Sequence, residues 1–194
     1  MIRPSSPFLL TSGLVAPFYI NCRKILGNVE ARTEIADAIS KDIVKYKPDV
    51  IAGGVTAGVP FATMVADRLE LPMAYIRPQP KEHGTGSQIE GAKVSGSKVL
   101  LVEDLITTAK SIGHFIQALR GEGAEVSNVS VIFSRMTESA EIKLSKLGVS
   151  LSILCDLDTL LDVAKEEGRA SQLEIEEVMA FLKCPEKWSA NNSK

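Results

Sequence analysis

Residues 98–111 place a short apolar run, two adjacent acids and several hydroxyl-bearing residues in direct succession. The run at 99–102 predicts a parallel strand that is buried on both faces, and the apolar positions within 111–119 recur with helical spacing. The turn between them is expected at the C-terminal edge of a sheet, where free N–H groups and the helix dipole favour an anion. Glu103 and Asp104 would repel an anion but suit sugar hydroxyls or Mg²⁺. A sugar phosphate offers both kinds of group.

A purely structural role for this junction is the alternative. Turns between strands and helices are common in α/β proteins, and their Ser and Thr residues often only cap the helix. Residues 109–111 look like the end of a Walker A loop, but the glycines of that motif are missing. The pair of acids followed by hydroxyl residues favours the binding site.

The composition restricts the class of protein. The chain has 194 residues, of which 45% are hydrophobic and 24% charged, which is ordinary for one globular domain. A net charge of −2 argues against a general binder of nucleic acids or membrane surfaces. The three cysteines are widely spaced, form no metal-ligand pattern and fit a reducing cytoplasm. No apolar run has the length of a membrane span and no signal peptide is recognisable, so we expect a cytoplasmic protein.

Strands and helices alternate along the chain, which predicts an α/β fold: a mostly parallel central sheet with helices on both faces. Ligands of such folds bind at the C-terminal ends of the strands. We predict one domain over 1–184, with a small irregular N-terminal region at 1–28, and a disordered tail at 185–194. The expected strands cover 49–53, 73–77, 99–102, 126–134 and 149–154, and the expected helices cover 30–46, 60–69, 111–119, 138–147, 157–164 and 171–182.

Two further segments follow predicted strands. The glycine-rich segment 52–60 leads into a helix, and it either holds a second anion or is a tight turn that needs glycine for packing, the interpretation that we favour on local grounds. The segment 77–91 carries Arg77, Lys81 and His83 and is long for a structureless loop, so it is either a binding loop or a disordered insertion.

Two single residues near the predicted strand ends are also candidates. Arg135 follows the strand at 126–134 and either grips a carboxylate with two parallel hydrogen bonds or pairs with Glu138. His114 falls off the apolar face of its helix and is expected to be solvated.

Together these segments resemble a known family. Residues 99–111 resemble the phosphoribosyl-pyrophosphate (PRPP) signature of type I phosphoribosyltransferases, and 75–91, with Lys81-Glu82-His83-Gly84, resemble the catalytic loop of their orotate-specific members. Residues 10–13, 17–24, 53–60 and 134–135 match as well, so the resemblance covers about residues 8–155. It implies the type I phosphoribosyltransferase fold and the transfer of phosphoribose from PRPP to orotate in pyrimidine synthesis. It also implies Mg²⁺ as cofactor and a homodimer with shared active sites.

The resemblance also implies residue roles. Lys81 and His83 would close over the pyrophosphate and act in catalysis with Asp104, while Arg77 would reach the neighbouring subunit's site. Orotate would contact Arg135, Thr107 and Tyr19, and Mg²⁺ would be held mainly by PRPP, with no direct protein ligand. The implied PRPP-binding set is Gly53, Gly54, Thr56, Arg77, Lys81, His83, Glu103, Asp104, Leu105, Ile106, Thr107, Thr108, Ala109, Lys110 and Ser111.

The chain departs from the family pattern at several positions. Lysines are replaced at three places, glycine is absent from the phosphate turn, and an acid is absent before the base-binding arginine; the residues concerned are Thr11, Ala57, Pro78, Ala109, Lys110 and Ser134. Two alternatives therefore stay open: a phosphoribosyltransferase for another base, and a non-catalytic regulator that senses PRPP and binds a nucleic acid. The retained Lys81 and His83 and the slightly acidic charge argue against the regulator.

Overall fold

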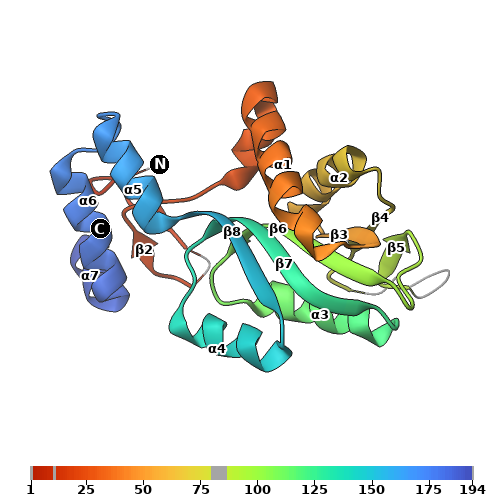
Figure 1. Cartoon of the computed structure of the whole chain (residues 1–194). Helices are drawn as coiled ribbons and strands as arrows, with labels where there is room; N and C mark the ends of the chain where they lie inside the picture. Colours follow the sequence, from red (N-terminus) through yellow and green to blue (C-terminus); the bar gives the residue numbers. More distant parts are fainter. Residues whose placement is uncertain (1, 11, 80–86, 194) are drawn as a thin grey trace. The chain divides into compact units, whose positions relative to one another are not determined.

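The computed structural model describes residues 2–10, 12–79 and 87–193, which form two compact units (Figure 1). The larger unit is Cys22–Asp156, and the smaller one combines Met1–Asn21 with Leu157–Lys194. We predicted one domain over 1–184, whereas the N-terminal segment groups with the C-terminal helices in a unit of its own.

The larger unit is an α/β sandwich around a six-stranded sheet of order β5-β4-β3-β6-β7-β8. All neighbouring strands are parallel except β5, which pairs with β4 in the antiparallel sense. The elements in chain order are η1 (Cys22–Gly27), α1 (Val29–Ile43), η2 (Val44–Tyr46), β3 (Val50–Gly54), α2 (Gly58–Leu69), β4 (Met73–Ile76), β5 (Ile89–Gly91), β6 (Lys98–Ile106), α3 (Lys110–Gly121), β7 (Glu125–Ser134), α4 (Glu138–Leu147) and β8 (Ser150–Asp156).

The strand order reverses between β3 and β6. From β3 the chain continues through α2 to β4 on one side, and from β6 it continues through α3 to β7 on the other. Ligands of open α/β sheets bind outside the carboxyl ends of the strands at such a reversal. The topology therefore predicts a ligand site at the C-terminal ends of β3 and β6.

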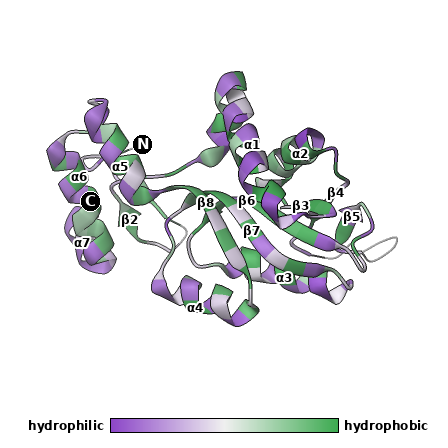
Figure 2. Ribbon diagram, in the orientation of Figure 1, coloured by the Kyte–Doolittle hydropathy of each residue, from purple (hydrophilic) through white to green (hydrophobic). Residues whose placement is uncertain are grey.

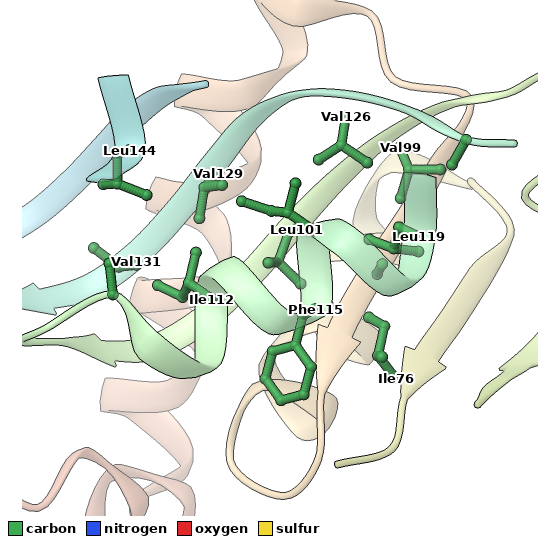
Figure 3. Packing of buried hydrophobic residues seen from close by; sticks show 14 of the residues in the cluster. Ile76, Val99, Leu101, Ile112, Phe115, Leu119, Val126, Val129, Val131 and Leu144 are labelled. Carbon is green, nitrogen blue, oxygen red and sulfur yellow. The ribbon is translucent and has the colours of Figure 1, made fainter. Parts of the chain in front are cut away.

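The buried apolar residues form two layers, one on each face of the sheet. In β6, Val99 and Leu101 pack against the α3 side, and Leu100 and Val102 pack against the side of α1 and α2, because successive side chains of a strand point to opposite faces. Figure 3 shows the first layer, in which Phe115 projects from α3. Figure 2 shows hydrophobic stretches on the central strands and mixed hydropathy on the helices that cover them. The prediction of a strand buried on both faces is thus confirmed.

Two elements differ from the expectation at the centre of the chain. We expected the strand to end at Val102, but β6 continues to Ile106, because its backbone pairs with β7 through Glu103↔Val131 and Ile106↔Ser134. The acids therefore lie inside the strand and not in the turn after it. The segment 77–91, interpreted as either a binding loop or a disordered insertion, ends in a strand, β5, which is held by the backbone of β4.

The smaller unit contains a two-stranded antiparallel hairpin, β1 (Phe8–Leu9) with β2 (Val15–Ala16), and the helices α5 (Leu157–Glu166), α6 (Gln172–Lys183) and α7 (Pro185–Asn192). The N–H of Val15 donates to the Ser189 hydroxyl at 2.9 Å, which ties the hairpin to α7.

Helix α7 replaces the disordered tail that we predicted for residues 185–194. Pro185 stands in its first turn, where a missing N–H costs nothing. Trp188 is only 6% exposed, packs edge-on against Phe181, and donates its indole N–H to Glu177 at 2.6 Å. One buried aromatic side chain thus orders a segment whose composition alone is polar.

Candidate functional site

A cavity of about 600 Å³ lies where β6 ends and α3 begins. Its lining comes from the turn between these elements, the first turns of α3, the segment that directly follows β4 and one residue of the loop after β3. The lining residues are Val55, Pro78, Gln79, Leu105, Ile106, Thr107, Thr108, Ala109, Lys110, Ser111, Ile112, His114 and Phe115. The structure thus brings the predicted residues 105–111 together in one cavity.

The first turn of α3 lies at this cavity, and as in any α-helix its first N–H groups have no partner within the helix. Its N-cap residue, Ala109, has a left-handed backbone (φ +52°) and makes no side-chain cap. The first turn contains no acid, and Lys110 and Ser111 are exposed. Free N–H groups, the helix dipole and a lysine together favour an anion.

The turn is held from the neighbouring strand. The N–H of Arg135 donates to the Ile106 carbonyl at 3.0 Å, and the N–H of Thr137 donates to the Thr107 carbonyl at 3.2 Å. These bonds place the start of the turn at 107–111 directly beside the end of β7. The side chain of Arg135 is partly buried, and this burial lowers its pKa.

The glycine-rich loop after β3 packs tightly against β6. A Cβ on Gly54 would overlap the Glu103 carboxyl and the Phe115 ring, and one on Gly58 would lie 2.6 Å from Glu103 Oε1. Packing therefore requires glycine at both positions, whether or not the loop also binds an anion. Val55 lines the cavity and Thr56 is exposed, so the loop also borders the site.

The two acids of β6 have different surroundings. Glu103 lies on the α3 side, against Gly54 and Gly58, and is only 6% exposed; its Oε1 has no hydrogen-bond partner among the described residues. Burial, and secondarily the charge of Asp104, raises its pKa to about 8, although backbone hydrogen bonds from Asp104 and Gly54 oppose the rise. Asp104 is half-buried, and burial raises its pKa too, while the positive charge of Arg23 opposes that rise.

The raised pKa of Glu103 predicts a pH-dependent stability. Its pKa rises from 4.5 to about 8 on folding, so the folded chain holds a proton that the unfolded chain has lost between these values. The free energy of unfolding should therefore fall as the pH rises from about 4.5 to about 8 and then level off. In Glu103→Gln, which stays neutral, this fall should be smaller, with the contribution of Asp104 remaining. Urea unfolding across this pH range measures both slopes, and equal slopes would contradict the assignment.

Arg77, Tyr19, Lys81 and His83 are the other residues that the family resemblance implies. Arg77 follows β4, and its Nη1 lies 4.0 Å from Oε1 of Glu90 in β5. Tyr19 belongs to the smaller unit, is 40% exposed, and its ring lies 5.8 Å from that of Phe8. Lys81 and His83 lie outside the described residues.

His114 is the site residue that sequence reasoning missed. It is exposed, as expected, but its ring lines the cavity and its Nε2 contacts Pro78 and Gln88. The signal for it was present in the sequence: His114 follows Lys110 by four residues and Ser111 by three, so all three share one side of a helix.

No helix among the described residues is both long enough and apolar enough to cross a membrane. Within the same part of the chain, no group of three or more His, Cys, Asp or Glu side chains is arranged to hold a metal ion.

Comparison with known proteins identifies relatives of this chain. Residues 24–153 match the family described as "Phosphoribosyl transferase domain". The chain is 40% identical over 191 residues to an orotate phosphoribosyltransferase of Lactococcus lactis, covering 97% of this chain and 91% of the relative. It is 39% identical over 187 residues to the enzyme of that name from Bacillus subtilis, covering 95% and 87%. The crystal structure of orotate phosphoribosyltransferase from Aeropyrum pernix superimposes with a TM-score of 0.71 at 31% identity, covering 86% of this chain and 92% of that one.

Proposed function

Because the chain belongs to the orotate phosphoribosyltransferase family, we propose that it transfers the 5-phosphoribosyl group of PRPP to orotate. The products are orotidine 5′-monophosphate and pyrophosphate, and the reaction serves pyrimidine synthesis. The observation that carries the proposal is the cavity lined by the first turn of α3 and by Leu105 and Ile106, the two residues of β6 that directly follow its acids.

The 5′-phosphate of PRPP is proposed to bind at residues 107–111. One support is the set of N–H groups in the first turn of α3, which follow Ala109 and have no partner within the helix. The hydroxyls of Thr107, Thr108 and Ser111 and the ammonium group of Lys110 add further donors. Lys110 supplies a positive charge that the family's usual glycine at this turn does not.

The ribose hydroxyls are proposed to bind the acids of β6. Asp104 is partly exposed and suits this role, and its negative charge would stabilise the positive charge that develops on the sugar ring. Glu103 is almost fully buried against Gly54 and Gly58, so its main contribution would be to hold the glycine loop in place. The loop at 53–58 would in turn bind the pyrophosphate.

The protein supplies alignment and charge stabilisation, and no covalent intermediate with a side chain is needed. The bond between C1′ and the pyrophosphate oxygen breaks with its electron pair going to pyrophosphate and leaves an oxocarbenium-like sugar; orotate N1 bonds to C1′ and gives up its proton, which the pyrophosphate accepts. Lys81 and His83 are proposed to stabilise the leaving pyrophosphate, and Arg77 to act in the neighbouring subunit's site of a cytoplasmic homodimer.

Mg²⁺ is proposed as cofactor, held mainly by oxygens of PRPP. The chemistry of the site is compatible with the ion, because the partly exposed Asp104 carries hard carboxylate oxygens of the kind that Mg²⁺ accepts. When bound, the ion would neutralise charge on the departing pyrophosphate.

Orotate is proposed to bind beside Thr107, with its carboxylate on Arg135; Tyr19 is the aromatic residue that the family resemblance implies for stacking on the base. The support is the backbone bond that holds Arg135 next to the anion-binding turn, and the suitability of a guanidinium for a carboxylate. Thr11 is among the departures from the family pattern and lies outside the described residues. Most family members carry charged side chains at the positions of Ala57, Pro78 and Ser134, so this site has fewer charged groups with which to bind its substrates.

Replacing Arg135 with alanine should raise the KM for orotate by about ten- to a hundredfold, because hydrogen bonds to a charged group are lost. The KM for PRPP should change much less. Initial rates with each substrate varied separately measure the two constants. If orotate binding is unaffected in Arg135→Ala, the carboxylate binds elsewhere.

An absorbance assay of orotate consumption with PRPP and Mg²⁺ tests the proposed function. Parallel reactions with uracil and the purine bases test a preference for another base. If the chain binds PRPP but consumes none of these bases, a PRPP-sensing role replaces the proposed one.

A further inference from the structure

His114 connects α3 to the two chain segments that flank residues 80–86. Its Nε2 lies 3.0 Å from the Pro78 carbonyl oxygen and 2.8 Å from Gln88 Nε2. Gln88 Nε2 also donates to the Arg77 carbonyl at 2.8 Å, and the N–H of Arg77 donates to the Gln88 carbonyl at 2.9 Å. One ring nitrogen thus contacts both segments, and these segments are bonded to each other.

The donors and acceptors at this point can be counted. Gln88 Nε2 carries two hydrogens: one goes to the Arg77 carbonyl, and the other is shared between the Pro78 carbonyl, at 3.5 Å, and a His114 ring nitrogen that has no hydrogen, at 2.8 Å. In the other tautomer, the His114 Nε2–H donates to the Pro78 carbonyl. We call Arg77, Pro78 and Gln88, which flank residues 80–86, the stem. Either tautomer ties α3 to this stem, through Gln88 in one case and through Pro78 in the other.

The tie acts across the cavity. His114 stands one helical turn beyond Lys110 and Ser111, and all three line the cavity. Pro78 and Gln79 line it as well, from the segment that leaves β4. A bond from His114 to this stem therefore sets how far one wall of the cavity stands from the turn at 107–111.

We propose that His114 is a positioning residue for the phosphorylated pentose: it acts through Gln88 and Pro78 to hold the cavity wall at the distance that PRPP requires. The inference rests on the proposed function and adds to it a residue outside the anion-binding turn and the acids. Because the wall that His114 holds faces the turn at 107–111, where the phosphate of PRPP is proposed to bind, the loss of His114 would weaken PRPP binding more than orotate binding.

Three variants test the proposal. His114→Ala removes the tie, and His114→Gln keeps an amide that both accepts from Gln88 and donates to Pro78. Gln117→Ala is the matched control, since Gln117 is exposed on the same helix one turn later. Calorimetry measures the Kd for PRPP without orotate, initial rates give both KM values, and hydrogen exchange reports the Arg77 amide, which donates to Gln88.

In His114→Ala we expect the Kd and KM for PRPP to rise by about two- to tenfold, the effect of one or two lost hydrogen bonds. The KM for orotate should change less than about twofold on the same scale. Exchange of the Arg77 amide should be faster, and His114→Gln should restore all these values. The proposal would be overturned by a Kd for PRPP in His114→Ala within about twofold of that of the unchanged chain. It would also be overturned if His114→Gln did not restore PRPP binding, or if Gln117→Ala weakened PRPP binding as much as His114→Ala.

The outcomes separate this proposal from the proposed function. If the unchanged chain binds PRPP but does not consume orotate, the proposed function fails, and the role of His114 is still decided by the Kd series. If the unchanged chain does not bind PRPP, both fail.

Discussion

Replacing Asp104 with asparagine is expected to lower kcat/KM by about two to three orders of magnitude, the loss typical of removing one electrostatic group from a developing charge. Asparagine keeps the size of the side chain but not its charge, and it cannot accept hydrogen bonds with both of its terminal atoms. Asp104 is only half-buried at the end of β6, so the fold should tolerate the change.

Steady-state rates with saturating orotate and varied PRPP measure this loss. Asp67→Asn is the matched control, because Asp67 is an exposed acid on α2. The thermal midpoint should not fall, since the asparagine variant removes a half-buried charge whose pKa burial raises. A rate within about threefold of the unchanged enzyme would exclude Asp104 from charge stabilisation.

Replacing Gly54 with alanine should both destabilise the larger unit and abolish most activity. The added Cβ would overlap the Glu103 carboxyl and the Phe115 ring, neither of which can move freely, because both are buried. Overpacking of this kind costs about 1–3 kcal/mol, and displacement of the buried acid would add to it. The glycine loop would shift with it, and the proposed pyrophosphate site would be lost.

Urea unfolding and the orotate assay measure the two effects. Gly121→Ala is the control, because nothing lies within 4 Å of a Cβ at that position and alanine suits a helix. The control should be as stable as the unchanged chain or slightly more so. A Gly54→Ala chain of normal stability and activity would show that Glu103 and Phe115 do not constrain the loop.

The periodic segments of the chain were predictable because their pattern reports burial directly. Ile112, Phe115, Ile116 and Leu119 repeat on one face of α3, and all four are buried in the structure. The strand at 99–102 is uninterrupted by polar residues because helices cover both sides of it. The family resemblance rested on local motifs in the same way.

The features that the sequence did not predict depend on distant partners. Strand β6 extends through Glu103 to Ile106 because β7 pairs with it, and β5 exists because β4 offers it a backbone. Helix α7 is ordered by the contact of Trp188 with Phe181. None of these contacts leaves a periodic signal in its own segment.

The order of residues alone determined the alternation of strands and helices and the position of the turn before α3 that we propose to bind a phosphate, since both follow from hydrophobic period and from helix ends. Only the tertiary structure decided that Glu103 is buried beneath the glycine loop while Asp104 stays partly open, and that His114 reaches the stem at Pro78 and Gln88. The physical reason is that burial and hydrogen bonding depend on which strands and loops become neighbours in space, and the strand order places segments far apart in the chain at one edge of the sheet.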